Sequence, residues 1–200
     1  MPKKLIAKFM AASALAVAGV AVIPAASADQ ASCNTAGCTT ANVPVNFSIV
    51  IPAVLRLQIG AVGSTPQVNW TAAAITATNV GDGNAINADS VTNGGAGAGL
   101  VGYALISNIS NNNATLTATG SGTGFNAGGA TDIPYTAVDA TAVATLGAAV
   151  ALPVPGSPTT VAPASGLIFR TGTWQYYYVN TDIYPAGTYT GTINYTATQP

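Results

Sequence analysis

Beyond residue 28 the sequence contains no lysine, glutamate, histidine or methionine. The charged side chains in this part are two arginines and six aspartates, which gives a formal net charge of −4. A serine nucleophile would have neither histidine nor lysine as its base. Two arginines cannot follow a phosphate backbone, which excludes nucleic-acid binding. We therefore expect a structural or binding protein that needs no cofactor, and not an enzyme.

Acid–base catalysis by two carboxylates is the remaining enzymatic possibility, as in glycosidases. Asp29 lies in the polar leader over residues 29–42. The other aspartates are Asp82, Asp89, Asp132, Asp139 and Asp182. No spacing among them marks a catalytic pair. The sequence therefore predicts no catalytic residue.

Residues 1–28 have the three parts of a secretion signal. Three lysines lie among the first eight residues, an apolar run continues to residue 23, and small residues precede Asp29. This order predicts export and cleavage before Asp29. A membrane anchor is the alternative, but a spanning helix needs about 20 apolar residues and this run is shorter. No later stretch has the composition of a membrane span.

The chain has two cysteines, Cys33 and Cys38, in a polar leader over residues 29–42. In an oxidising compartment such a pair closes a small disulfide loop. A metal site would need two further ligands, and no histidine or third cysteine is present to supply them. We expect a disulfide and no metal centre.

Alternation of apolar and polar residues begins after the leader and indicates β-strands. Pro52 interrupts the first alternating stretch, and residues 54–59 continue it with leucine and isoleucine on one face. Before Pro52 the side chains that share a face are Val45, Phe47, Ile49 and Ile51.

Further short strands are expected, separated by Gly, Pro and Asn turns. Their ranges are 68–71, 101–109, 114–119, 133–138, 167–170, 173–179 and 188–198. Residues 79–99 and 120–132 are expected to be loops, and residues 140–150 remain open between helix and strand. No sustained helical period is present, so residues 43–200 are predicted to form one all-β domain, a β-sandwich.

Aromatic residues gather at Trp174, Tyr176, Tyr177 and Tyr178. In a strand, Trp174, Tyr176 and Tyr178 share one face, and we expect that face to be core because aromatics dominate burial. Tyr177 would then be the exposed ring. It is the candidate platform for a sugar ligand.

The other candidate site is a calcium site, formed by the side-chain oxygens of Asp82-Gly83-Asn84 and Asp89. Carboxylate and amide oxygens suit calcium. The alternative is a set of Asx turns, in which these side chains bond their own backbone. The complete EF-hand spacing is absent, and the Asx turns are favoured.

The two ends of the predicted domain resemble secreted pilin subunits of the chaperone–usher type, especially the alternate and archaic branches with spore-coat-protein-U-like domains. The resemblance lies in the alternating stretch 45–51, Pro52, the strand at 54–59, and the final Gly187-Thr188-Tyr189-Thr190-Gly191-Thr192-Ile193-Asn194-Tyr195. It covers about a quarter of the chain beyond the signal. The cysteine positions differ from the inter-strand disulfide that is common in pilins.

The resemblance implies an immunoglobulin-like sandwich that lacks one strand and is completed by donor-strand exchange. Val45, Phe47, Ile49 and Ile51 would be the donor residues. The partners would be copies of the chain or related pilins, a periplasmic chaperone and an outer-membrane usher. The chain would pass through the periplasm into a surface fimbria or coat with a role in cell adhesion.

Two alternatives remain open at this point. Residues 43–59 could be the first long strand of a complete sandwich, bent at Pro52. The chain would then be a monomeric secreted binding module, with glycans as the candidate ligand.

Overall fold

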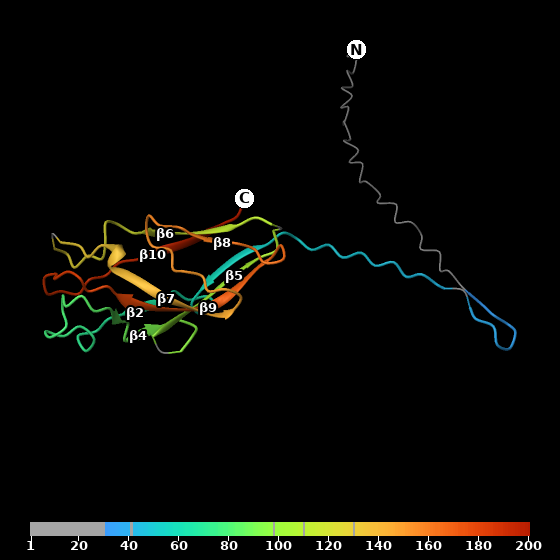
Figure 1. The fold of residues 1–200 in the computed structure, drawn as a ribbon, viewed down its shortest axis with the longest axis horizontal. Helices are drawn as coiled ribbons and strands as arrows, with labels where there is room; N and C mark the ends of the chain where they lie inside the picture. Colours follow the sequence, from blue (N-terminus) through green and yellow to red (C-terminus); the bar gives the residue numbers. More distant parts are fainter. Residues whose placement is uncertain (1–30, 41, 98, 110, 130) are drawn as a thin grey trace, which may run out of the picture. The chain divides into compact units, whose positions relative to one another are not determined.

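The computed structural model describes residues 31–200 except 41, 98, 110 and 130 (Figure 1). The predicted signal peptide, residues 1–28, and its cleavage site lie outside the described residues. The chain divides into two units at Val50 and Ile51, and the second, Ile51–Pro200, contains all the described strands.

The first unit contains the disulfide. Cys33 and Cys38 are joined as predicted, with their Cα atoms 6.2 Å apart. The backbone N–H of Cys38 donates to the carbonyl of Thr35 at 3.3 Å, which closes the loop as a turn. No helix in the described part of the chain is long and apolar enough to cross a membrane.

The second unit is built from antiparallel strands in three sheets (Figure 1). The strands are β1 (Leu55–Ile59), β2 (Gln67–Asn69), β3 (Ile86–Asn87), β4 (Ser90–Thr92), β5 (Leu100–Ser107), β6 (Ala114–Gly120), β7 (Val138–Leu146), β8 (Thr159–Val161), β9 (Ile168–Tyr178) and β10 (Ile193–Thr198). One short 3₁₀ helix, Tyr135–Ala137, precedes β7. The predicted all-β, sandwich-like fold is confirmed.

The largest sheet is organised around β9. β7 pairs with β9 along residues 171–178, and β5 pairs with residues 168–175. β3 pairs with Tyr177 and Tyr178, where β7 also pairs, so β3 continues the edge of β9 that β5 occupies. β1 pairs with β5 and ends this sheet. The second sheet has the order β10-β6-β8, and β2 pairs with β4.

The core lies between the inner faces of these sheets. In β5 every second residue is buried, from Val101 to Ser107, and β9 buries Ile168, Trp174 and alternate tyrosines. Leu116 of β6 closes the core from the second sheet. The period of two in the sequence therefore corresponds to burial on one face, as expected for half-buried strands.

The stretch predicted as two strands, 167–170 and 173–179, is one continuous strand. Gly172 lies at its middle, where a Cβ atom would stand 2.3 Å from the carbonyl oxygen of Val143 in β7. It would also stand 2.5 Å from the hydroxyl oxygen of Tyr103. This glycine permits close packing and does not mark a turn.

Further predictions are corrected or decided. Residues 79–99, expected to be loops, contain β3 and β4, and the strand expected at 188–198 begins only at Ile193. The strand expected at 133–138 is wrong, because Pro134 precedes a 3₁₀ turn and Ile133 makes only an isolated bridge to Phe125. Residues 140–150, left open between helix and strand, lie largely in β7.

Candidate strand-addition site

β1 is an edge strand. It pairs with β5 from Leu55 opposite Ser107 to Ile59 opposite Tyr103, and no ladder joins its other edge in the described part of the chain. β10 has the same property in the second sheet, since it pairs with β6 alone among the described strands. The two edge strands approach each other although they belong to different sheets. β1 and β10 thus each have one strand edge without a ladder partner among the described residues, and the side of the sandwich that these two edges bound is called its open side.

The apolar side chains on this side are only half-buried. They face the core and pack against it, yet none is enclosed as the central residues are; they are Leu55, Leu57, Ile59, Tyr195 and Ala197. Leu57 lies opposite Leu105 in the ladder, and Leu105 is completely buried. Leu57 is only half-buried, so the burial of apolar side chains decreases from β5 to the neighbouring edge strand β1.

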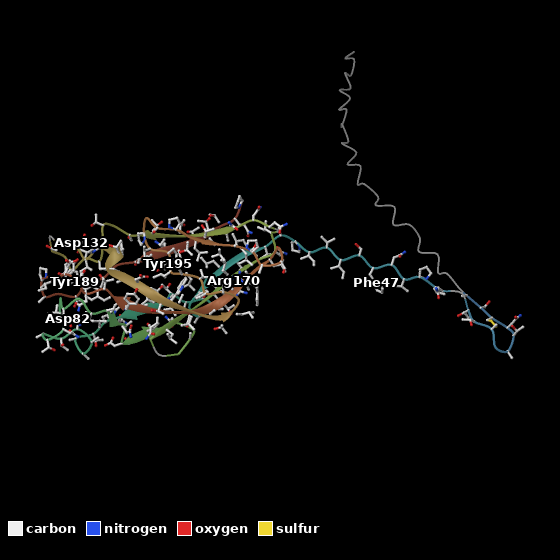
Figure 2. The ribbon with its side chains drawn as sticks, in the orientation of Figure 1. Phe47, Asp82, Asp132, Arg170, Tyr189 and Tyr195 are labelled. Atoms are coloured by element: carbon white, nitrogen blue, oxygen red, sulfur yellow. A yellow bond between two sulfur atoms is a disulfide. The ribbon has the colours of Figure 1, made fainter. Side chains whose placement is uncertain are left out.

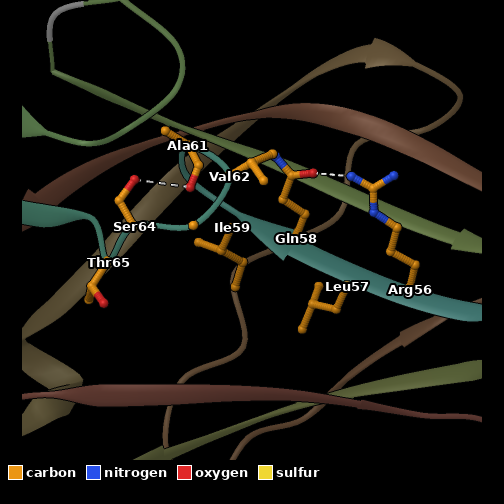
Figure 3. Close-up of a pocket in the computed structure, with 9 residues that line it drawn as sticks. Arg56, Leu57, Gln58, Ile59, Ala61, Val62, Ser64 and Thr65 are labelled. Atoms are coloured by element: carbon orange, nitrogen blue, oxygen red, sulfur yellow. Dashed lines mark hydrogen bonds between the residues drawn. The ribbon is translucent and has the colours of Figure 1, made fainter.

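A shallow surface pocket of about 550 Å³, open to solvent, lies along β1 and the turn after it (Figure 3). Leu57 and Ile59 extend to one side of the strand, and Arg56 and Gln58 extend to the other (Figure 3). Arg56 Nη2 donates to Gln58 Oε1, so the polar face is satisfied within the strand itself. The apolar face is directed to the core side.

The residues predicted as a donor strand carry largely exposed apolar side chains, and their neighbour Val50 is exposed as well. Val45 is 69 % exposed, Phe47 85 %, Ile49 83 % and Ile51 75 %. No strand is assigned to residues 42–54, and Phe47 projects from an extended backbone (Figure 2). β1 begins at Leu55, so residues 43–59 do not form one strand. A run with this pattern has apolar surface to bury, and no strand ladder among the described residues includes it.

Asn108 holds the chain between this run and β1. Its side-chain oxygen accepts from the backbone N–H of Val54 at 2.6 Å, and its Nδ2 donates to the carbonyl of Pro52 at 2.8 Å. Its backbone N–H donates to the carbonyl of Val54 at 3.2 Å. The sequence predicts Asn108 only as a residue near the end of the strand 101–109, because nothing local relates it to a segment more than 50 residues earlier.

The aromatic residues 174–178 alternate between the buried and the outer face of β9, as predicted. Trp174, Tyr176 and Tyr178 are buried. Tyr177 lies on the outer face and is half-buried, and its hydroxyl donates to Asp139 Oδ2 at 3.1 Å. Partial burial and the nearby Asp139 carboxylate raise the pKa of Tyr177. The candidate sugar platform is thus one ring whose polar atom already has a partner.

Among the candidate calcium residues, Asp82 and Asn84 bond each other, whereas Asp89 bonds a different loop residue. Asp82 accepts from the backbone N–H of Asn84 at 2.9 Å, which is the bond of an Asx turn, and from Asn180 Nδ2 at 2.9 Å. Asp89 accepts instead from the N–H and hydroxyl of Thr71. Among the described residues no three side chains of the metal-binding types form a group.

These hydrogen bonds also determine the acidity of the loop carboxylates. Bonds from Asn84 lower the pKa of Asp82, and the bond from the Thr71 hydroxyl lowers that of Asp89. Bonds from Thr123 and Asn126 lower the pKa of Asp132. Asp82, Asp132 and Tyr189 lie toward the same end of the second unit (Figure 2). The acidic groups therefore organise loops by accepting hydrogen bonds.

Comparisons of the chain with family models, curated proteins and solved structures give no significant match.

Proposed function

We propose that this chain is an exported structural subunit that assembles with copies of itself by β-strand addition. The residues 43–51 of one copy enter the open side between β1 and β10 of the next. The observation that carries the proposal is complementarity within one sequence: an unpaired alternating apolar run and a half-covered apolar core with two free strand edges.

Both residues 43–51 and the free edges of β1 and β10 have the groups that strand addition requires. Backbone groups of the incoming segment would pair with the free edge of β1 or β10, which supplies affinity without sequence dependence. Alternate side chains would enter the core beside residues such as Leu57 and Tyr195, which sets the register. Four apolar side chains at about 1.5–3 kcal/mol each would contribute roughly 6–12 kcal/mol before the costs of ordering the segment.

The product of this contact is a filament. One surface patch of a copy binds a different patch of its neighbour, so the contact is heterologous and continues in one direction. A fimbria or surface coat is the assembly that this geometry favours. Free strand edges and an exposed apolar run also invite aggregation, so a periplasmic chaperone and an outer-membrane usher are the proposed assembly partners.

Electron microscopy of protein recovered from the surface of its own host tests the proposal, with a variant that lacks residues 43–51 as the comparison. We expect filaments from the full sequence and compact particles from the deletion variant. Uniform monomers from both proteins would contradict assembly, and a secreted binding module would then be the better description.

A peptide experiment isolates the contact itself. A peptide with the sequence of residues 43–51 should bind the deletion variant and block assembly of the intact chain. The matched control is the same peptide with Phe47 and Ile49 replaced by aspartate, which keeps the backbone and removes the apolar face. Equal binding of both peptides would contradict recognition by alternate side chains.

A further inference from the structure

We propose that Pro52 and Asn108 keep residues 43–51 out of the open side of their own chain, which leaves the segment available to a second copy. This inference rests on the function proposed above. It concerns how the same site selects between its own strand and a neighbour's strand.

Self-insertion is the obvious competing reaction. Residues 52–54 alone separate Ile51 from Leu55, the first residue of β1. A hairpin with Pro52 and Ala53 at its centre would place the segment antiparallel beside the free edge of β1. Such an intramolecular partner acts at an effective concentration in the millimolar range. A chain that assembles between copies therefore needs a feature that disfavours this hairpin.

Pro52 excludes the two turns that join strands best. Two-residue hairpins use type I′ turns, with positive φ at both central residues, or type II′ turns, with positive φ at the first. The proline ring holds φ near about −65°, so Pro52 cannot occupy the first position of either turn. Ala53 is likewise absent from the residues with positive φ. The shortest route back to β1 is therefore sterically closed.

Asn108 opposes the longer routes. A loop of four or five residues would include Val54 and Pro52, whose backbone groups Asn108 holds at 2.6 and 2.8 Å through its side chain. With its own N–H bonded to the carbonyl of Val54, Asn108 extends the pairing of β1 and β5 beyond Leu55 and Ser107. These bonds restrict the backbone of residues 52–54, so a longer fold-back loop must either form around them or break them. The chain is thus committed to an extended path before β1.

The test uses substitutions that reopen the hairpin. Pro52→Gly combined with Asn108→Ala places glycine where a type II′ turn requires positive φ and removes the side-chain bonds. Pro52→Ala combined with Asn108→Ala is the matched control, because alanine resists positive φ as other L-residues do. Pro52 is exposed, and Asn108→Ala leaves the backbone bond to Val54 in place. All proteins are produced from the full-length chain.

Hydrogen exchange of residues 43–51 is measured over a range of protein concentrations, together with sedimentation. In the original sequence, protection and mass should both increase with concentration. In the glycine double variant, exchange should be at least tenfold slower than in dilute original protein, independent of concentration, and the protein should stay monomeric. The alanine double variant should still assemble.

The possible outcomes distinguish a failure of the role given to Pro52 and Asn108 from a failure of the proposed strand addition. Equal assembly by the original protein and the glycine double variant would overturn the role of Pro52 and Asn108 and leave strand addition intact. Absence of both protection and assembly in every protein would overturn strand addition, and this inference with it. The single variant Pro52→Gly, altered only at an exposed position, repeats the test if the double variant does not fold.

Discussion

Tyr103 and Trp174 stack with ring centroids 4.7 Å apart, and both bond the backbone of Val150. The N–H of Val150 donates to the Tyr103 hydroxyl at 2.9 Å, and Trp174 Nε1 donates to the Val150 carbonyl at 2.8 Å. Val150 is buried but belongs to no strand. Two aromatic side chains thus replace the ladder bonds that a buried backbone segment requires.

The first prediction concerns this arrangement. Tyr103→Phe keeps the stacked ring and leaves the buried N–H of Val150 without an acceptor. We expect the free energy of unfolding to decrease by about 1–3 kcal/mol, measured by urea denaturation. Tyr189→Phe is the control, since the Tyr189 hydroxyl bonds Pro185 at an exposed position. An effect of Tyr103→Phe no larger than that of the control would contradict the role given to this bond.

The second prediction concerns the close contact at Gly172. Gly172→Ala would place a methyl group against the Val143 carbonyl and the Tyr103 ring. Because neither neighbour is a flexible side-chain end, we expect a loss of roughly 1–3 kcal/mol in unfolding free energy. Gly129→Ala is the control, since no atom lies within 4 Å of the added carbon. Equal melting temperatures for both variants would show that β7 and β9 can separate freely at this point.

The third prediction concerns alkaline pH. Burial raises the pKa of both Tyr176 and Tyr195, whose hydroxyl oxygens lie 3.4 Å apart. Below about pH 10, the ordinary tyrosine value, both folded and unfolded chains keep these phenols neutral, so their contribution is fully present. Above it the unfolded phenols ionise first, and stability decreases as pH rises.

Tyr176→Phe removes one of these groups. Its unfolding free energy should decrease less steeply above pH 10, by up to about 1.4 kcal/mol per pH unit relative to the original sequence. Denaturation curves at pH 8 provide the reference, since neither phenol titrates there. Parallel pH profiles for the two proteins would contradict the assignment.

The fourth prediction separates the two faces of residues 43–51. Phe47→Asp should weaken association between copies by at least tenfold, because about 1.5–3 kcal/mol of apolar burial is lost and a charge must be buried. Asn46→Asp adds the same charge on the opposite face and should change association less. Thermal unfolding of the Ile51–Pro200 unit should be the same in both variants. Equal weakening by both would indicate a charge effect without register.

Much of the fold could be predicted because burial on one face produces a period of two in β5, β6 and β9. The failures have physical causes. Gly172 resembles a break in a strand, but its small size serves the contact with Val143. Residues 133–138 have strand composition, but Pro134 directs the chain into a 3₁₀ turn.

The candidate site was half predictable. The apolar face of residues 45–51 is local and therefore visible in the sequence. The open side is not local, because it needs β1 and β10, which are more than 130 residues apart in the chain. Pairing of distant strands leaves no local pattern. For the same reason the role of Asn108 could not be predicted, because its bonds are to Pro52 and Val54, more than 50 residues earlier.

The positions of the two arginines have a consequence for proteolysis. Beyond residue 28, trypsin can cleave only after Arg56 and Arg170, and both lie inside strands of one sheet. Arg56 pairs with Ile106 from the edge strand β1, and Arg170 pairs with Leu105 from the central strand β9. Cleavage after Arg56 therefore requires only that an edge opens, whereas cleavage after Arg170 requires the centre of the sheet to open. Cleavage after Arg56 and cleavage after Arg170 would report separately on local and global unfolding of the same sheet.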